Sequence, residues 1–403
     1  MAGPVGREPA VTDRTLRGRA AVVGVGESGY YRRSQSPYPE FVLCLQAVLA
    51  ACQDAGVDPR SIDGFVSYAD DRNSSVRLAS ALGIDELRWS TMQWGGGGGG
   101  GSGAVQQAAA AIATGQAECV VVYRALAQGQ FGRFGQSSRT GQVRGAGAFG
   151  APYGVLSPAQ MFAMKVTRFF EETGVSPDTQ KAVALASYHH AQQNPRAVMH
   201  GRPLSAEDYD ESRWIVEPFR LFDCCQENDA AAALVLVADD RAAGLRPDPV
   251  FVLAAAQGGG YRSEAPAHNA PTYATAGFAQ VAPRLYAMAG MTPDDVDVVQ
   301  AYENFTGGTV MALVEHGFCT PETADQVLTF ENLIAPNGGL PLNTSGGNLA
   351  ECYTHGLELH VEAVRQLRGE STNQVPGARV ALVASGPMVT PATDALYGTA
   401  DTL

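Results

Sequence analysis

The chain has 403 residues, of which 45% are hydrophobic, 17% charged and 8% aromatic, a composition typical of a globular protein with a large core. Its formal net charge of -13 argues against a nucleic-acid-binding protein. No run of about 18 apolar residues is present to span a membrane. Residues 1–18 lack the apolar stretch of a signal peptide, and we expect them to form a disordered N-terminus.

The seven cysteines are odd in number, and most of them lie within apolar segments. No CxxC pair is present, which argues against a zinc site of that type. This usage predicts free thiols in a reducing cytoplasm. The histidines show no metal-ligand spacing, and we expect neither a metal nor an organic cofactor.

Buried strands and helices alternate along the first part of the chain. We expect strands at residues 19–25, 62–68 and 118–123, and helices at 39–55 and 103–114. This alternation predicts an α/β protein with a largely parallel sheet.

The second part of the chain repeats this order. Residues 55–68 and 289–302 share the same spacing of glycine, proline, aspartate and tyrosine. We therefore predict two duplicated halves, 19–245 and 246–403. The alternative is that two unrelated βαβ units look alike.

An insertion is expected within the first half. Between Cys119 and Phe170 there is no aspartate or glutamate, although the chain as a whole is acidic. Recurring glycines from Gly129 to Gly154 indicate loops, and a helix is expected at 158–172. We expect residues from about 125 to 215 to form an inserted loop domain.

One glycine motif is not expected to bind a ligand. Residues 24–29 (GVGESG) match the GxGxxG fingerprint of dinucleotide-binding proteins. That fingerprint needs a helix that starts at the glycines, so that its N-terminus faces the pyrophosphate. Here residues 30–37 are typical of a loop, so we expect no nucleotide site.

A run of seven glycines, residues 95–101, joins Trp94 to Ser102 at the start of a helix. Such a backbone lets a ligand approach closely and offers N–H groups at a helix N-terminus. We interpret the run as one wall of a binding site. The alternative is a flexible linker.

A predicted strand of the second half ends in three polar side chains, Tyr302, Glu303 and Asn304. Ligands bind beyond the carboxyl ends of strands in doubly wound sheets, so these residues are site candidates. The alternative is that Asn304 caps the next helix.

Residues 343–356 (NTSGGNLAECYTHG) place many polar and titratable groups in one turn. This density favours a functional site over a purely structural turn. Within it, Cys352 is a candidate nucleophile with His355 as its partner, unless Cys352 faces the core.

These segments together resemble the thiolase superfamily, and most closely its branch of sterol-carrier-type lipid-transfer proteins. The resemblance extends from about residue 19 to 398, and residues 221–231 (LFDCCQENDAA) are similar to that branch's segment before the last strand of the first half. It implies a thiolase-like α/β fold of two duplicated βαβαβαββ halves in a five-layer αβαβα arrangement, with an inserted loop domain.

The chain departs from the thiolase pattern at the residues that carry out the chemistry in thiolases. The position of the thiolase nucleophilic cysteine falls near Gly98, and the second thiolase cysteine falls near Gly386. Tyr353 and Tyr302 stand where thiolases of this branch have histidines. Without a thiolate there is no acyl-enzyme, so thiolytic acyl transfer is not expected.

This pattern is similar to the steroid side-chain-cleaving aldolases of actinobacteria. The resemblance implies retro-aldol cleavage of a 17-hydroxy steroid C22 acyl-CoA to a 17-ketosteroid and propionyl-CoA. It also implies a homodimer through the thiolase-type interface and a partner with a DUF35 domain, together a heterotetramer.

A retro-aldol step needs a base, an acid and stabilisation of an enolate. We assign Tyr353 as the base, with His355 or Glu351 as its relay partner, because a phenol with a pKa of about 10 is otherwise a weak base at neutral pH. Tyr302, with Asn304 nearby, is assigned to the thioester side.

The acid-free span is expected at the acyl-CoA entrance or at the dimer contact. Its arginines, Arg124, Arg133, Arg139 and Arg144, are candidates for phosphate pairing. The residues expected to contact the substrate are Gly98, Gly99, Gly100, Ser102, Arg124, Arg133, Gly346 and Gly386.

Two other functions stay open from the sequence. The first is a non-catalytic carrier of sterols or acyl-CoA, and the second is a cysteine-dependent thiolase that uses Cys352 or Cys225. The polar groups at 302–304 and 353–355 favour an enzyme over a carrier.

Overall fold

The computed structural model describes residues 15–95, 97–131, 145, 147–263, 270 and 272–403. In this part of the chain, ten strands form one mixed sheet that runs through both halves. None of the helices described there has the length and apolarity needed to cross a membrane.

The two halves order their strands in the same way about the β1–β9 pair, which joins them. From this junction outward, the first half runs β1, β8, β5, β3, β4, and the second runs β9, β12, β11, β10. A parallel bridge from Val299 to Leu342 stands where the first half has β4. The strands are β1 (Ala20–Glu27), β2 (Tyr31–Arg32, paired with β8), β3 (Gly64–Tyr68), β4 (Trp89–Gln93), β5 (Cys119–Ala127), β8 (Asn228–Ala238), β9 (Val250–Gly258), β10 (Val298–Ala301), β11 (Val380–Ser385) and β12 (Ala392–Gly398).

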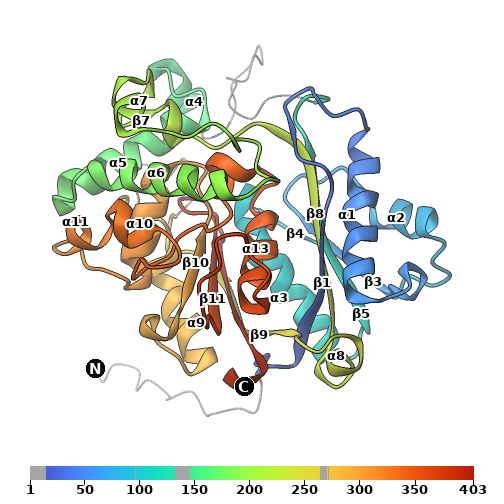
Figure 1. The fold of residues 1–403 in the computed structure, drawn as a ribbon. Helices are drawn as coiled ribbons and strands as arrows, with labels where there is room; N and C mark the ends of the chain where they lie inside the picture. Colours follow the sequence, from blue (N-terminus) through green and yellow to red (C-terminus); the bar gives the residue numbers. More distant parts are fainter. Residues whose placement is uncertain (1–14, 96, 132–144, 146, 264–269, 271) are drawn as a thin grey trace, which may run out of the picture.

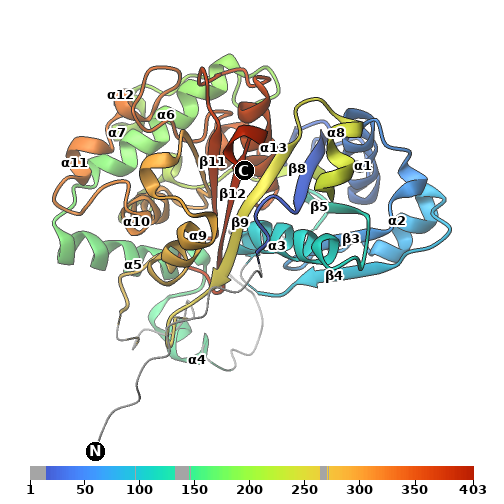
Figure 2. The ribbon, with the colours of Figure 1, turned by 90° about the horizontal axis from the view of Figure 1, so that it is seen from below.

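Helices α3 (Gly100–Ala113) and α13 (Leu357–Arg368) lie between the two halves and contact strands of both (Figures 1 and 2). The small side chains of α3 allow this close approach. The outer layers are α1 (Glu40–Ala55), α2 (Ser75–Leu82) and α8 (Asp239–Leu245) on the first half, and α9 (Ala282–Ala289) and α10 (Thr306–His316) on the second. The five layers of the expected thiolase fold are therefore present.

The segment between β5 and β8 forms the insertion. It holds α4 (Gly147–Gly150), α5 (Pro158–Thr173), α6 (Asp178–Gln193), α7 (Ala206–Glu211), β6 (Trp214–Val216) and β7 (Phe219–Arg220). Figure 1 shows α5 and α6 beside α10, and α6 also contacts α11 (Ala324–Val327), α12 (Phe330–Leu333) and the π-helical turn Gly347–Glu351. The insertion of the first half thus packs on the second half, near the end of β10.

Gly24 and Gly26, from the GxGxxG match, lie on β1 against α1. A Cβ atom at either position would overlap the backbone of Ala51. These glycines therefore allow β1 and α1 to pack closely. This is a structural role and not that of a nucleotide site.

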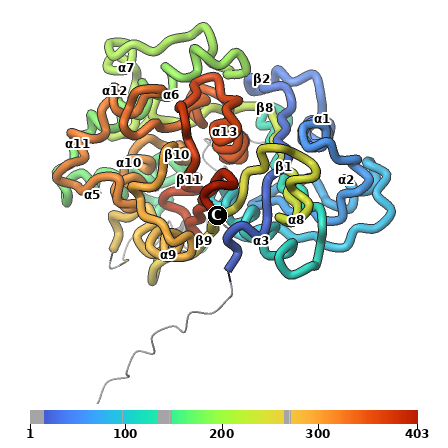
Figure 3. The backbone as a smooth tube through the Cα atoms, turned by 60° about the horizontal axis from the view of Figure 1, so that its bottom comes forward, coloured from blue at the N-terminus to red at the C-terminus, as the bar shows by residue number. Residues whose placement is uncertain are grey.

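The start of the described chain lies beside its C-terminus (Figure 3). Arg17 Nη2 donates to the Thr402 carbonyl at 2.8 Å, and Gly18 N–H donates to the Val252 carbonyl. Of the 18 residues expected to be disordered, 1–14 lie outside the described residues, whereas Arg17 and Gly18 are already bonded to the fold.

Candidate active site

A cavity of about 1240 Å³ opens between the two halves and the insertion. The segments that follow β3, β4 and β10 line it, together with the start of α5 and part of α6. Most of the segments that the sequence singled out therefore meet in one place.

Tyr302 and Tyr353 come together in this cavity. Tyr302 directly follows β10, and Tyr353 follows the π-helical turn Gly347–Glu351. Their phenolic oxygens are 2.7 Å apart, at hydrogen-bond distance, and the side chains are almost fully buried. Burial raises the pKa of both phenols well above 10, so both are protonated at neutral pH.

Gly98 lies directly against the ring of Tyr302 in the cavity lining. A Cβ atom at Gly98 would overlap the ring of Tyr302. The phenol therefore occupies the space that a side chain at position 98 would need, and a nucleophile there is incompatible with this tyrosine.

The other glycines and Ser102 divide into two groups. Gly95 and Gly97 line the cavity with Gly98. The expectation of substrate contact is wrong for the rest, because they pack within the protein: Gly99 against Gly386, Gly100 against Tyr68, and Gly346 against Ala191. Ser102 is fully buried and bonded to Ser385 Oγ at 2.9 Å.

His355 lines the cavity beside Tyr353. Its ring meets the ring of Tyr353 edge-on, with centroids 5.3 Å apart. Its Nδ1 lies 2.7 Å from Nη2 of Arg124. The observed phenol partner of Tyr353 is Tyr302.

Arg124 is not a phosphate ligand. Its side chain is 1% exposed and forms ion pairs with Asp70 at 2.8 Å and Asp71 at 3.4 Å. The prediction from the acid-free span was wrong here because Asp70 and Asp71, from the end of β3, neutralise Arg124 in the fold. Arg133, Arg139 and Arg144 lie outside the described residues.

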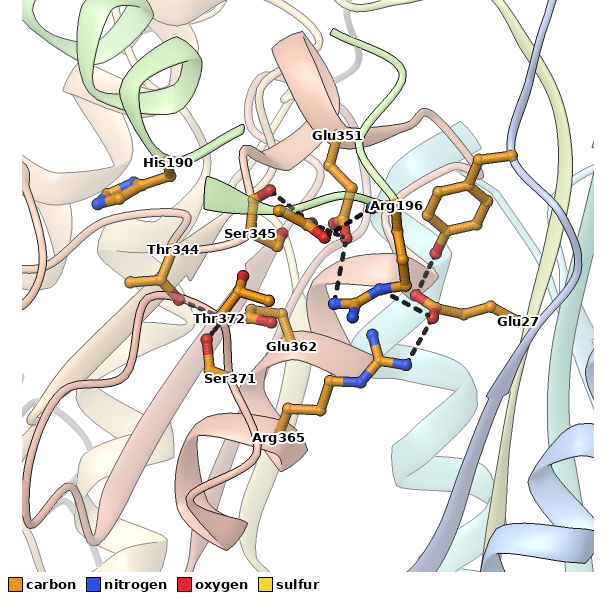
Figure 4. Close-up of polar contacts among 12 residues, drawn as sticks. Glu27, His190, Arg196, Thr344, Ser345, Glu351, Glu362, Arg365, Ser371 and Thr372 are labelled. Atoms are coloured by element: carbon orange, nitrogen blue, oxygen red, sulfur yellow. Dashed lines mark hydrogen bonds and ion pairs between the residues drawn. The ribbon is translucent and has the colours of Figure 1, made fainter. Parts of the chain in front are cut away.

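Glu351 is buried and does not belong to the cavity lining, so its assignment as a relay partner of Tyr353 is wrong. It lies in a charge cluster with the partly buried Glu27, Arg196 and Arg365 (Figure 4). Asn194 Nδ2 donates to Glu351 Oε1 at 2.9 Å. Burial, with the nearby charge of Glu27, raises the pKa of Glu351 to about 8.

Asn304 lines the cavity, as expected, and its Oδ1 accepts the Phe305 N–H at 3.0 Å. Its carbonyl accepts the N–H of Cys225, which also lines the cavity. Burial raises the pKa of the Cys225 thiol well above its ordinary value, which disfavours a thiolate. Cys352 is fully buried and does not belong to the cavity lining.

Two buried glutamates hold the loops that carry the tyrosines. Asn348 bridges them: its Oδ1 accepts the Glu303 N–H at 2.8 Å, and its Nδ2 donates to Glu358. Ser187 donates to Glu303, and Thr354 donates to Glu358. Burial raises the pKa of each carboxyl group to about 7.

The sequence analysis did not predict two parts of the cavity wall. One is apolar and aromatic and combines α5, α6 and the end of the insertion; its members include Ala159, Met161, Phe162, Tyr188, Leu221 and Phe222. The other is rich in arginine: Arg32, Arg33, Arg202 and Arg213. The polar loop after β1 was the available signal for Arg32 and Arg33.

Comparison with known proteins finds relatives of the kind that the resemblance in the sequence implied. Residues 259–399 match the family model described as thiolase C-terminal domain-like. The chain is 38% identical over 386 residues to a 17-hydroxy-3-oxo-4-pregnene-20-carboxyl-CoA lyase of Mycobacterium tuberculosis, covering 92% of this chain and 97% of that protein. It is also 38% identical over 383 residues to a steroid side-chain-cleaving aldolase of Thermomonospora curvata, covering 92% and 96%.

Among solved structures, the chain is similar to one described as Ltp2-ChsH2(DUF35) aldolase. The TM-score is 0.88 at 37% sequence identity, and the match covers 96% of this chain and 99% of that one. A second structure, an acetyl-CoA acetyltransferase of Syntrophomonas wolfei, has a TM-score of 0.67 at 18% identity, covers 94% and 98%, and shares the fold.

Proposed function

Because the chain belongs to the thiolase superfamily, in the family of its steroid side-chain-cleaving aldolases, we propose that it cleaves a β-hydroxyacyl-CoA by a retro-aldol reaction. The observation that carries this proposal is the hydrogen-bonded pair Tyr302–Tyr353 facing Gly98. The pair supplies groups that move protons, and the glycine leaves no nucleophile.

In the proposed reaction, the β-hydroxyl group loses its proton and becomes a carbonyl. The bond between the α and β carbons breaks, and its electrons pass to the thioester as an enolate. A proton then returns to the α carbon. Overall, one carbon–carbon bond breaks, one carbonyl forms and one proton passes from oxygen to carbon, with no net oxidation or reduction, so the reaction as written needs neither a metal nor an organic cofactor.

The two phenols are suited to relay this proton. Because both pKa values are raised, neither tyrosine is a phenolate base in the free protein. We propose that Tyr353 accepts the hydroxyl proton while its own proton passes to Tyr302 across the 2.7 Å contact. In the same step Tyr302, beside Asn304, gives its own proton to the developing enolate on the thioester side, so each phenol is neutral again afterwards.

The shape of the cavity supports a large substrate with a charged end. The apolar and aromatic wall fits a fused-ring lipid, and the arginine-rich wall fits the phosphates of coenzyme A. With the names of the relatives, this supports a 17-hydroxy steroid C22 acyl-CoA, cleaved to a 17-ketosteroid and propionyl-CoA.

We also propose a partner with a DUF35 domain, because the similar solved structure is described as an aldolase with such a domain. A homodimer, a heterotetramer with the partner and a cytoplasmic location stay predictions.

The test is incubation with a 17-hydroxy steroid C22 acyl-CoA, with and without a DUF35-domain protein, followed by mass spectrometry. Release of propionyl-CoA and a 17-ketosteroid is expected, with no acyl group attached to the protein. Binding without turnover in both arms would favour a carrier. An acylated protein whose formation stops in Cys352→Ala or Cys225→Ala would favour a cysteine-dependent thiolase.

A further inference from the structure

A buried guanidinium lies directly behind the wall of the cavity. Arg124, on β5, has both of its terminal nitrogens bonded. Nη1 donates to the Tyr68 carbonyl at 3.1 Å, and Nη2 donates to Asp70 at 2.8 Å. With Asp71 at 3.4 Å, two carboxylates balance the single positive charge.

The same Nη2 also contacts His355. It lies 2.7 Å from Nδ1 of the imidazole. A guanidinium has only donors and keeps its charge in proteins, so Nδ1 has to be the acceptor. The proton of a neutral imidazole then lies on Nε2. An imidazolium would place two cations in contact.

The backbone and the ring of His355 are held from several sides. Its φ of +56° is in the left-handed region, and its carbonyl accepts the Tyr68 hydroxyl at 2.9 Å. The charged groups that act on the ring are Arg124, Asp70 and Arg72. Burial, followed by Arg124, keeps the pKa of His355 well below its ordinary value of 6.5.

We propose that Arg124 is a positioning residue, which holds His355 as a neutral imidazole with its proton on Nε2. His355 then serves the cavity as a hydrogen-bond donor and does not compete with the tyrosines for the proton. This inference rests on the proposed function only in taking the cavity as the reaction site. An imidazolium beside Tyr353 would stabilise a phenolate and disrupt a relay between neutral phenols.

The first test needs no substrate. In the full-length protein with ¹⁵N-labelled histidine, the signals of His355 are assigned by their loss in His355→Asn. Between pH 6 and 8 we expect Nδ1 to remain unprotonated and Nε2 to remain protonated. A proton on Nδ1, or a His355 that becomes charged in this range, would overturn the inference.

The second test removes the guanidinium. In Arg124→Met, Asp70 loses the cation that it pairs with, so its charge favours the imidazolium and opposes the effect of burial. We therefore expect the pKa of His355 to rise and its signals to titrate between pH 5 and 8. The kcat/KM of the Arg124→Met variant for the acyl-CoA should also become dependent on pH in this range. Arg124→Lys, which keeps the charge, should restore part of the original profile.

Arg368→Met is the matched control. Arg368 is another buried arginine, paired with Asp54 at 2.8 Å. Its loss should lower stability but leave the His355 signals and the pH profile unchanged. If Arg124→Met and Arg368→Met behave alike, Arg124 has only a structural role. Because the NMR signals do not depend on turnover, failure of the proposed reaction would not affect this test.

Discussion

Two phenols that share a hydrogen bond can move a proton without either becoming a stable anion. Tyr302 and Tyr353 have this arrangement, and burial keeps both protonated. In such a relay, one phenolic oxygen takes up a proton while the other phenol releases its own. The proposed reaction therefore does not require a phenolate at neutral pH.

Tyr302→Phe and Tyr353→Phe should each keep the fold and lower kcat about 10²–10⁴-fold, the usual contribution of one acid or base. Only the phenolic oxygen is removed, so the ring packing stays. Circular dichroism and steady-state kinetics would measure the two effects. Tyr397→Phe is the control, because this buried phenol bonds His360 outside the cavity lining and should not affect turnover. Wild-type rates in either cavity variant would contradict the relay.

Gly98→Ala should displace Tyr302 and remove most of the activity. The added methyl group would overlap the phenol ring, and the backbone of the buried glycine turn has little room to shift. We expect a loss of at least about tenfold in kcat/KM, the result of an angstrom-scale misplacement of a reacting group. Gly244→Ala has open space around the new methyl group and serves as the control. Normal activity in Gly98→Ala would show that Tyr302 does not need its present position.

At the scale of elements, the π-helical turn Gly347–Glu351 joins the loop that carries Tyr353 to the charge cluster around Glu351. On one side it leads to Tyr353, and on the other Glu351 points toward Arg196 and Glu27 (Figure 4). Arg365 pairs with Glu27 at 2.6 Å. The turn is therefore anchored by charges on β1, α13 and the segment after α6.

Glu351 should make the stability of the protein depend on pH. Its pKa rises from 4.5 to about 8 on folding. The stabilisation is therefore complete below about pH 4.5 and is lost as the pH rises through 8. Between these values the slope from one such group is at most about 1.4 kcal/mol per pH unit.

Glu351→Gln should remove this slope, because an amide keeps the oxygen that accepts from Asn194 but does not ionise. Urea unfolding at pH 6 and pH 8.5 would show a smaller loss of stability in the variant than in the wild type. Glu207→Gln, at an exposed site on α7, is the control. An unchanged slope in Glu351→Gln would contradict the assignment of a buried, protonated carboxyl group.

At the scale of the whole molecule, β4 is the last strand at one edge of the sheet in the part of the chain that the structure describes. Met92 on this strand is 42% exposed, and Trp94 just after it is 82% exposed. Apolar side chains at an unpaired edge favour association with another chain. Because Trp94 also lines the cavity, a partner at this edge would stand beside the active site.

Met92→Glu should therefore weaken the predicted homodimer. A charge on each copy would be buried at the shared edge, which disfavours association. Sedimentation velocity should show a dimer for the wild type and a shift toward monomer for the variant. Leu49→Glu is a control, because Leu49 is exposed on α1, away from β4. A wild-type monomer, or a variant dimer of unchanged affinity, would place the interface elsewhere or exclude it.

The sequence by itself determined the order of the elements and the main residues of the cavity. Hydrophobic periodicity and glycine stops are local properties, so β1, α1, β5 and α5 form close to the predicted ranges. The equal spacing before Tyr68 and Tyr302 indicated the two halves. The resemblance to thiolases then pointed to Tyr302, Tyr353 and Gly98 as members of one site.

Only the tertiary structure decided the partners of the charged and polar groups. Glu351 and Tyr353 are two residues apart, yet the backbone between them directs one into a charge cluster and the other into the cavity. Arg124 lies in an acid-free stretch of sequence but meets two carboxylates from the turn after β3. A side chain's partners come from segments distant in the chain, and burial and charge balance among those segments set its role.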